Sequence, residues 1–167
     1  MFALLTLAAL TPPAAAATPA PISFGFTHAD TVGYSPVSGL LTDTSAVQAV
    51  VPVGGIFAID ARVGMSTGIS AYYVIPYPTG AAIDYRVGPR LGGAKGLYAS
   101  LLAGESTPLD GSVSAPSLAL VAGWTFATAK GTQFGPEVEL GGHGLGAGFT
   151  VRWATRPRAV PSAPSPG

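Results

Sequence analysis

The sequence contains no cysteine, which excludes a disulfide framework and any metal site built on thiolates. Charged residues are also scarce: Asp, Glu, Lys and Arg make up 10% of the 167 residues, where a globular domain usually carries about a quarter. Lys plus Arg and Asp plus Glu are equal at eight each, so there is no excess positive charge for binding DNA or RNA. We therefore expect no nucleic-acid partner, no metal and no other cofactor.

Long apolar runs are missing as well. The hydrophobic fraction is 48% and the mean hydropathy is +0.45. Even so, the longest apolar stretches, such as residues 50–59, are interrupted by Pro52 and fall short of the ~18 residues that a spanning helix needs. The sequence therefore excludes a helical membrane protein, although water is a poor solvent for so apolar a chain.

The two ends of the chain differ in character from its centre. Residues 2–10 have the length of a signal-peptide hydrophobic region, and residues 11–20 supply the prolines and small residues that suit cleavage. We predict a signal peptide over 1–20, with a buried N-terminal helix as the alternative. Residues 154–167 are rich in Pro, Ser and Ala and predict a disordered tail. One domain, over 21–153, remains between them.

Glycine and proline, 23 and 16 residues, interrupt this domain so often that no helical pattern of about ten residues survives. Runs rich in β-branched and aromatic residues predict strands at about 22–26, 32–41, 47–53, 56–65, 69–77, 81–91, 96–103, 117–127, 133–141 and 146–153.

The charged residues of the predicted strands share one face. Successive strand side chains point to opposite sides, and in 56–65 both Asp60 and Arg62 alternate with large apolar residues. The strand charges are four acids and four arginines: Asp60, Arg62, Asp84, Arg86, Arg90, Glu137, Glu139 and Arg152. The lysines, Lys95 and Lys130, instead lie beside glycines at predicted turns.

This selection suits the inside of a narrow barrel, because arginine pairs bidentately with carboxylates and stays charged away from bulk water. We interpret the eight charges as a neutral lumenal network and the opposite face as a lipid-facing belt. The predicted belt comprises Phe57, Ile59, Val63, Ile83, Tyr85, Trp124, Phe126, Val138, Phe149, Val151 and Trp153.

Closure of the sheet follows from the same physics, since an open edge would leave backbone groups unpaired in hydrocarbon. The fold predicted is all-β, an antiparallel up-and-down transmembrane β-barrel. Eight strands of ~9–11 residues fit the domain, and ten is the alternative.

Two segments carry a family resemblance. Segment 83–104, with Gly88-Pro89-Arg90 followed by Lys95-Gly96-Leu97-Tyr98, resembles two consecutive strands of small bacterial outer-membrane β-barrel proteins of the OmpA/OmpX-like kind. Segment 148–153, from Gly148 to Trp153, is similar to the terminal strand that the outer-membrane assembly machinery recognises. The resemblance implies a protein of the bacterial outer membrane whose partners are membrane lipid and that machinery, and we expect a monomer.

Catalytic chemistry is not indicated. Outer-membrane lipid A deacylases resemble this architecture and carry a His-x-Ser pair near the last strand, but His143 is followed by Gly144 and Leu145, so the nucleophile is missing. Glu137 and Glu139 lie ~7 Å apart along one strand, a spacing open to acid–base work. Pairing of these carboxylates with Arg152 or Arg90 is the favoured interpretation.

The remaining acids, Asp30, Asp43, Glu105 and Asp110, fall in predicted loops without the spacing of a defined calcium site. We therefore predict a non-enzymatic outer-membrane barrel with a structural or surface-interaction role and a lumen closed by its charges. The alternative is a soluble secreted or periplasmic β-barrel or sandwich that binds a small apolar ligand.

Overall fold

A computed structural model describes residues 21–33, 39–72, 75–93, 95–142 and 144–155, which form eight β-strands. The strands are β1 (Ser23–Val32), β2 (Gly39–Gly54), β3 (Phe57–Tyr72), β4 (Ile75–Leu91), β5 (Gly96–Pro108), β6 (Ala115–Ala127), β7 (Thr132–Gly141) and β8 (Gly144–Ala154). Within these ranges the chain has no helix of the length and hydropathy needed to cross a bilayer.

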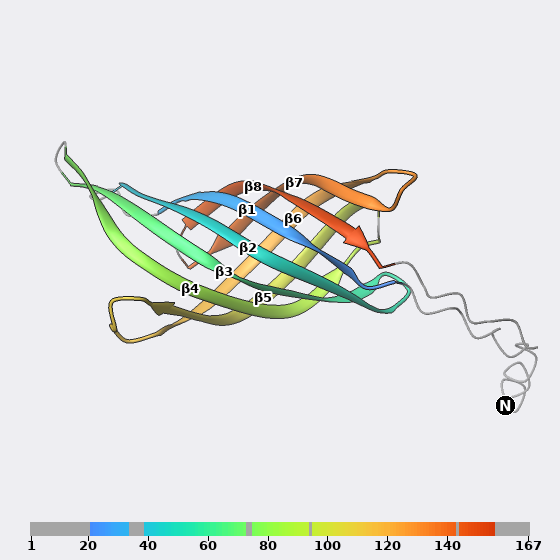
Figure 1. The fold of residues 1–167 in the computed structure, drawn as a ribbon, viewed down its shortest axis with the longest axis horizontal. Coiled ribbons are helices and arrows are strands. Elements are labelled where there is room, and N and C mark those ends of the chain that lie inside the picture. The colour runs from blue at the N-terminus through green and yellow to red at the C-terminus, as the bar shows by residue number, and fades with distance from the viewer. Residues whose placement is uncertain (1–20, 34–38, 73–74, 94, 143, 156–167) are drawn as a thin grey trace, which may run out of the picture.

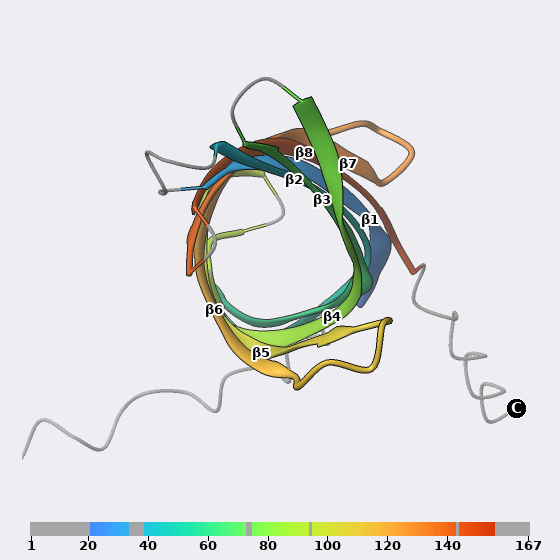
Figure 2. The same ribbon diagram turned by 90° about the vertical axis from the view of Figure 1, so that its left-hand side faces the viewer.

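The eight strands form one closed antiparallel barrel. Each strand pairs with its sequence neighbours, and β1 pairs with β8 to close the ring that Figure 2 shows nearly end-on. The prediction of an all-β, up-and-down barrel of eight strands is thus confirmed. The alternative of ten strands is wrong, and a single closed sheet is not a sandwich.

The two surplus predicted strands correspond to hairpin connections. Segment 32–41 covers the end of β1 and the start of β2, and segment 69–77 covers the end of β3 and the start of β4. Part of each lies outside the described residues. Strand-forming residues continue to the edge of both connections, so residue type alone did not mark the turns.

The barrel has two distinct ends. Ser23 lies opposite Ala154, so β1 begins and β8 finishes at the same end, together with the short β2–β3, β4–β5 and β6–β7 connections; we call this the turn end. The opposite, loop end carries the other four connections, and β3 and β4 extend farthest there (Figure 1). Lys95 and Lys130 are exposed at the turn end.

Two Gly-Pro sequences interrupt the backbone ladder. The backbone pairing of β4 with β5 is interrupted around Pro89, and that of β7 with β6 around Pro136, because proline has no N–H to donate. A Cβ on Gly88 would lie 1.8 Å from the Leu101 carbonyl oxygen, and one on Gly135 would lie 1.7 Å from that of Trp124. Glycine is therefore required before each proline for the adjacent strand to remain close.

The last strand runs slightly past the end predicted for the barrel domain. Strand β8 continues to Ala154, one residue past the predicted limit, and Thr155 N–H donates to the Ile22 carbonyl oxygen at 2.8 Å. Residues 1–20 and 156–167 lie outside the described residues, so the signal peptide and the disordered tail stay predictions.

Candidate functional site: the charged lumen

The inner wall of the barrel is polar and the outer wall is apolar. Because strand side chains alternate, the residues next to each large outward side chain point into the lumen. The eight strand charges all lie on this inner face: Asp60, Arg62, Asp84, Arg86, Arg90, Glu137, Glu139 and Arg152. The buried apolar cluster is small, consisting of Tyr98, Leu102 and Val121.

Arg62 on β3 is the centre of the lumenal network. Its guanidinium donates to both carboxylate oxygens of Glu137 on β7, at 2.8 and 3.1 Å. It also donates to Asp60, at 3.3 and 3.4 Å. Since β3 and β7 stand on opposite sides of the eight-stranded ring, this ion pair crosses the whole lumen.

Neutral side chains complete the hydrogen bonding of the two carboxylates. Gln48 donates to both oxygens of Asp60 at 2.8 and 2.9 Å, and Ser100 donates to Asp60 at 3.0 Å. Tyr98 donates its hydroxyl to Glu137 at 2.7 Å. Thr150 in turn donates to the Gln48 side-chain oxygen at 2.9 Å. The network therefore links strands from every side of the barrel.

A second ion pair lies nearer the loop end. Arg86 on β4 donates to Glu139 on β7, and Asp84 lines the same region. These three residues border a cavity of about 180 Å³ whose walls also carry the hydroxyls of six Ser and Thr residues: Thr31, Thr42, Thr44, Ser66, Ser106 and Ser117. Water has access to this pair, in contrast to the pair at Arg62.

Because water reaches the Arg86–Glu139 pair more easily than the Arg62–Glu137 pair, loss of Arg86 should lower the free energy of unfolding less than loss of Arg62. Arg86→Ala leaves the Glu139 carboxylate without its partner, and we expect the free energy of unfolding to fall by about 1–3 kcal/mol. Arg86→Lys, which keeps the charge, should recover part of the loss. Denaturant unfolding followed by tryptophan fluorescence measures both variants, and an unchanged midpoint for Arg86→Ala would mean that solvent already compensates Glu139.

The pairing differs from the sequence prediction in its partners. Glu137 and Glu139 were expected to bind Arg152 or Arg90, and instead they bind Arg62 and Arg86. Arg152 donates to Thr125 at 3.1 Å, and Arg90 stacks its guanidinium on the Tyr98 ring at 3.5 Å from the centroid. The sequence predicted the face of the strand on which each charged side chain lies. The residue that it contacts across the lumen depends on the register of the strands.

The outer wall carries the residues predicted as a belt. Ten of the eleven are exposed on the outside of the barrel, and Val151 has intermediate exposure. The ten are Phe57, Ile59, Val63, Ile83, Tyr85, Trp124, Phe126, Val138, Phe149 and Trp153. The predicted belt residues therefore lie on the outer wall of the barrel.

Three of the four acids expected in loops are instead in strands. Asp30 on β1, Asp43 on β2 and Glu105 on β5 lie in the halves of their strands nearest the loop end. Asp110 does lie in a connection, where it accepts hydrogen bonds from the hydroxyl of Ser112 and from its backbone N–H at 2.9 Å. Both bonds favour the ionised carboxylate and lower the pKa of Asp110.

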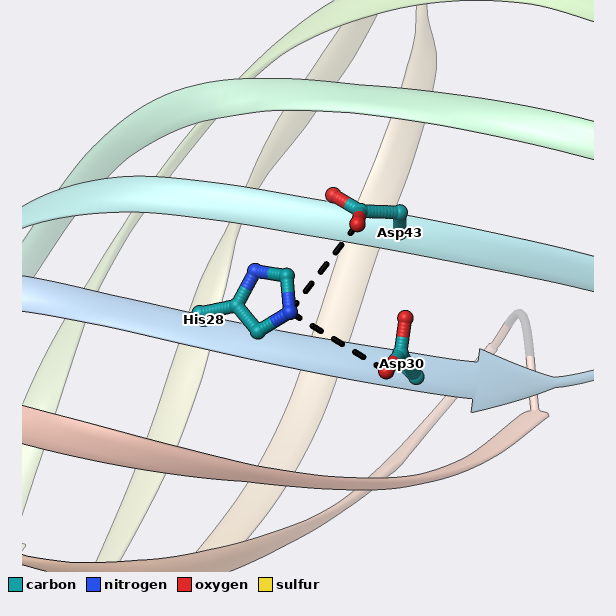
Figure 3. A group of neighbouring side chains, drawn as sticks. All are labelled: His28, Asp30 and Asp43. Carbon is teal, nitrogen blue, oxygen red and sulfur yellow. Dashed lines mark ion pairs between the residues drawn. The ribbon is translucent and has the colours of Figure 1, made fainter.

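A histidine and two of these acids form a group that sequence analysis missed. The Nε2 of His28 is 4.0 Å from an Asp30 carboxylate oxygen and 3.9 Å from one of Asp43, and its Nδ1 is 3.1 Å from the Ser45 hydroxyl. Figure 3 shows the imidazole beside both carboxylates. One donor atom from each residue lies within 4.8 Å of the others, close enough to hold a metal ion.

The sequence could have predicted only part of this group. His28 and Asp30 are two apart and so share a face, but Asp43 joins them because it pairs directly with Asp30 across β1 and β2. His143 lies outside the described residues.

No protein-family model and no curated protein sequence matches this chain. Among solved structures, the fold is similar to the solution NMR structure of the de novo designed TMB2.3, with a TM-score of 0.49 and 12% sequence identity. The match covers 86% of this chain and 100% of the designed one. The function is therefore inferred from the residues of this chain alone.

Proposed function

We propose that this protein is a bacterial outer-membrane β-barrel, exported by a signal peptide over 1–20, that spans the membrane as a monomer. Its role is structural or surface-interacting and not enzymatic, and its lumen is closed by the charge network. The observation that carries the proposal is the inverted distribution of side chains, with charges inside and large apolar residues outside.

This inversion is unfavourable in water and favourable in lipid. Phe26, Val63 and Leu120 expose 56%, 57% and 49% of their surface, whereas Asp60 and Arg152 expose 0% and 1%. Each Å² of apolar surface left in water forgoes about 25 cal/mol of stabilisation, and a buried charge adds a desolvation cost. A hydrocarbon surrounding removes the first penalty, and the ion pairs offset the second.

The dimensions of the barrel fit a bilayer. The shortest strands, β1 and β7, contain 10 residues each. At about 3.3 Å per residue and a tilt of ~40°, such a strand rises ~25 Å, the height of the apolar band on outer-membrane barrels.

The two rims of the apolar band differ in a way that suits membrane interfaces. Near the turn end, aromatic rings pack on the outer wall: Phe26 and Trp153 have centroids 6.1 Å apart, and Phe126 and Phe134 are 5.7 Å apart. Trp153 is a residue type that favours the headgroup level, and girdles of aromatic residues flank the apolar band of outer-membrane barrels. The outward acids are found toward the other, loop end, where polar headgroups and water begin.

The closed lumen predicts poor conductance. The Arg62–Glu137 pair crosses the barrel, and Tyr98, Gln48 and Ser100 fill the space around it. An apolar ligand, as the soluble alternative requires, would meet charged side chains in both described cavities. Arg86 and Glu139 line the cavity toward the loop end, and Arg90 and Arg152 line the other beside apolar residues. The polar interior therefore favours a membrane protein over a carrier of small apolar molecules.

Assembly by the outer-membrane machinery is part of this proposal, and the sequence pattern of the last strand supports it. In β8 the outward residues alternate regularly, and segment 148–153, from Gly148 to the aromatic Trp153, keeps the pattern that the resemblance identified. Because β8 pairs with β1 in the finished barrel, recognition of this strand has to come before closure.

Cell fractionation tests the proposal directly. We expect the protein to sediment with the envelope and to change its gel mobility between unboiled and boiled samples, because a closed membrane barrel resists detergent until it is heated. A periplasmic binding protein serves as the soluble control. Recovery of the chain in the periplasmic fraction, with no mobility change on boiling, would falsify the proposal.

A further inference from the structure

The charges of the lumen form two groups by contact. The group around Arg62 and Tyr98 holds three arginines and two carboxylates, an excess of one positive charge: Arg62, Arg90, Arg152, Asp60 and Glu137. The group that lines the cavity toward the loop end holds Asp84, Arg86 and Glu139, an excess of one negative charge. Arg90 and Arg152 lie close to the turn-end limits of β4 and β8, so the excess positive charge of the first group is found at the turn end.

Two arginines of this region have donors without a partner. Arg90 and Arg152 are each only 1% exposed, yet the Nη1 and Nη2 of Arg90 and the Nε of Arg152 make no hydrogen bond. Arg90 Nη1 is 3.6 Å from an oxygen of Asp60, but both oxygens of Asp60 already accept from Gln48, Arg62 or Ser100. Buried donors on a charged group are costly when left unpaired.

The positions of these guanidinium groups are fixed by their surroundings. The Tyr98 ring holds Arg90 by stacking at 3.5 Å, and Thr125 accepts from Nη2 of Arg152 at 3.1 Å. The unpaired N–H groups are buried, so a ligand in this region reaches them through a small shift of the two arginine side chains, and the hydrogen bonds that they lack favour that shift.

A cavity opens beside these two arginines at the turn end. It has a volume of about 130 Å³, and its walls include Ser23, Gln133, Arg90 and Arg152. A single water needs about 10–15 Å³ of such volume, so there is room for an ion of several heavy atoms. Ser23 and Gln133 supply further polar groups on the same walls.

We propose that this cavity is an anion-binding site that takes a phosphate group, held by Arg90 and Arg152. A phosphate offers several acceptor oxygens, and guanidinium groups bind such oxygens through paired, charge-assisted hydrogen bonds. The bound anion satisfies the free donors and cancels the excess positive charge. The site depends on the fold of the barrel and not on its placement in a membrane.

The test uses the full chain in detergent micelles, or in buffer if the protein proves soluble, with inorganic phosphate as the probe. Phosphate replaces chloride at constant ionic strength while the arginine Nε–H resonances are followed by ¹H–¹⁵N NMR. We expect a saturable shift of the Arg152 Nε–H signal. Filling of the cavity by water alone predicts no saturable shift, and that result overturns the proposal.

Two variants separate the site from general charge. Arg152→Gln removes one guanidinium, and we expect it to weaken phosphate binding by about tenfold or more, measured by calorimetry. Lys130→Gln removes the same charge from an exposed turn at the same end and should change the affinity by less than about twofold. Equal effects of the two substitutions would contradict a specific site.

A further measurement does not depend on the folding of any variant. The wild-type midpoint of thermal unfolding should rise in phosphate relative to chloride at equal ionic strength, because a ligand of the native state stabilises it. Short-chain phosphatidic acid added to the micelles distinguishes the source of the phosphate group. Competition with inorganic phosphate indicates a lipid headgroup, and its absence indicates a free solute; a midpoint identical in both salts counts against any site.

Discussion

Arg62→Met should lower the free energy of unfolding by about 3–5 kcal/mol, because it leaves two buried carboxylates without their common cation. The Arg62 side chain is 2% exposed, and its partners Asp60 and Glu137 are 0% and 1% exposed, so water cannot replace the lost bonds. Methionine retains an unbranched apolar side chain, so the effect reports mainly the loss of charge. The expected loss exceeds that for Arg86→Ala, whose partner is more accessible.

Reversible urea unfolding in micelles, followed by the fluorescence of Trp124 and Trp153, measures this loss. Lys130→Met removes the same charge from an exposed turn and should shift the midpoint little. Adding Glu137→Gln to Arg62→Met should restore part of the stability, since it removes one of the stranded charges. A loss below about 1 kcal/mol for Arg62→Met would show that the network is hydrated.

Leu120→Arg should destabilise the protein in lipid by about 2–4 kcal/mol, the cost of an arginine near the middle of the bilayer on an outer-membrane barrel. Leu120 points outward from the middle of β6, is 49% exposed, and stands between Leu101 of β5 and Leu140 of β7. In water the same change would place a charge in solvent and cost little. The substitution therefore separates a lipid-facing wall from a solvent-facing one.

Unfolding measured in lipid vesicles gives the result, and two controls frame it. Val113→Arg introduces the same charge in the β5–β6 connection, where Val113 is 90% exposed, and should be tolerated. Ala119→Ser, on the inner face at the neighbouring position, should also cost little. If Leu120→Arg is tolerated as well as Val113→Arg, the outer wall does not face lipid.

The anion site and the network depend on each other through Asp60. Its two oxygens are occupied by Arg62, Gln48 and Ser100, which is why Arg90 lacks a hydrogen-bonding partner although its Nη1 lies 3.6 Å away. Loss of Arg62 would release acceptor capacity on Asp60 for Arg90. We therefore expect Arg62→Met to weaken phosphate binding as well as stability.

The sequence by itself determined which side of each strand the charges occupy. A period of two fixes facing locally, so Asp60, Arg62, Arg86 and Arg90 could be assigned to one wall without knowing any partner. Alternation, the arginine-rich polar face and the position of the lysines at turns predicted an antiparallel barrel, with ten strands and a soluble sandwich left as alternatives. These features depend only on neighbours along the chain.

The tertiary structure alone decided which residues meet. The partner of Glu137 across the lumen is Arg62 because of the stagger between strands, a quantity that alternation does not contain, since a shift by two residues preserves every facing. The same stagger pairs Asp43 with Asp30 and leaves Arg90 and Arg152 beside a cavity with free donors. The side of a strand on which a residue lies is a local property of the backbone, whereas the partner of its side chain is a property of the closed barrel.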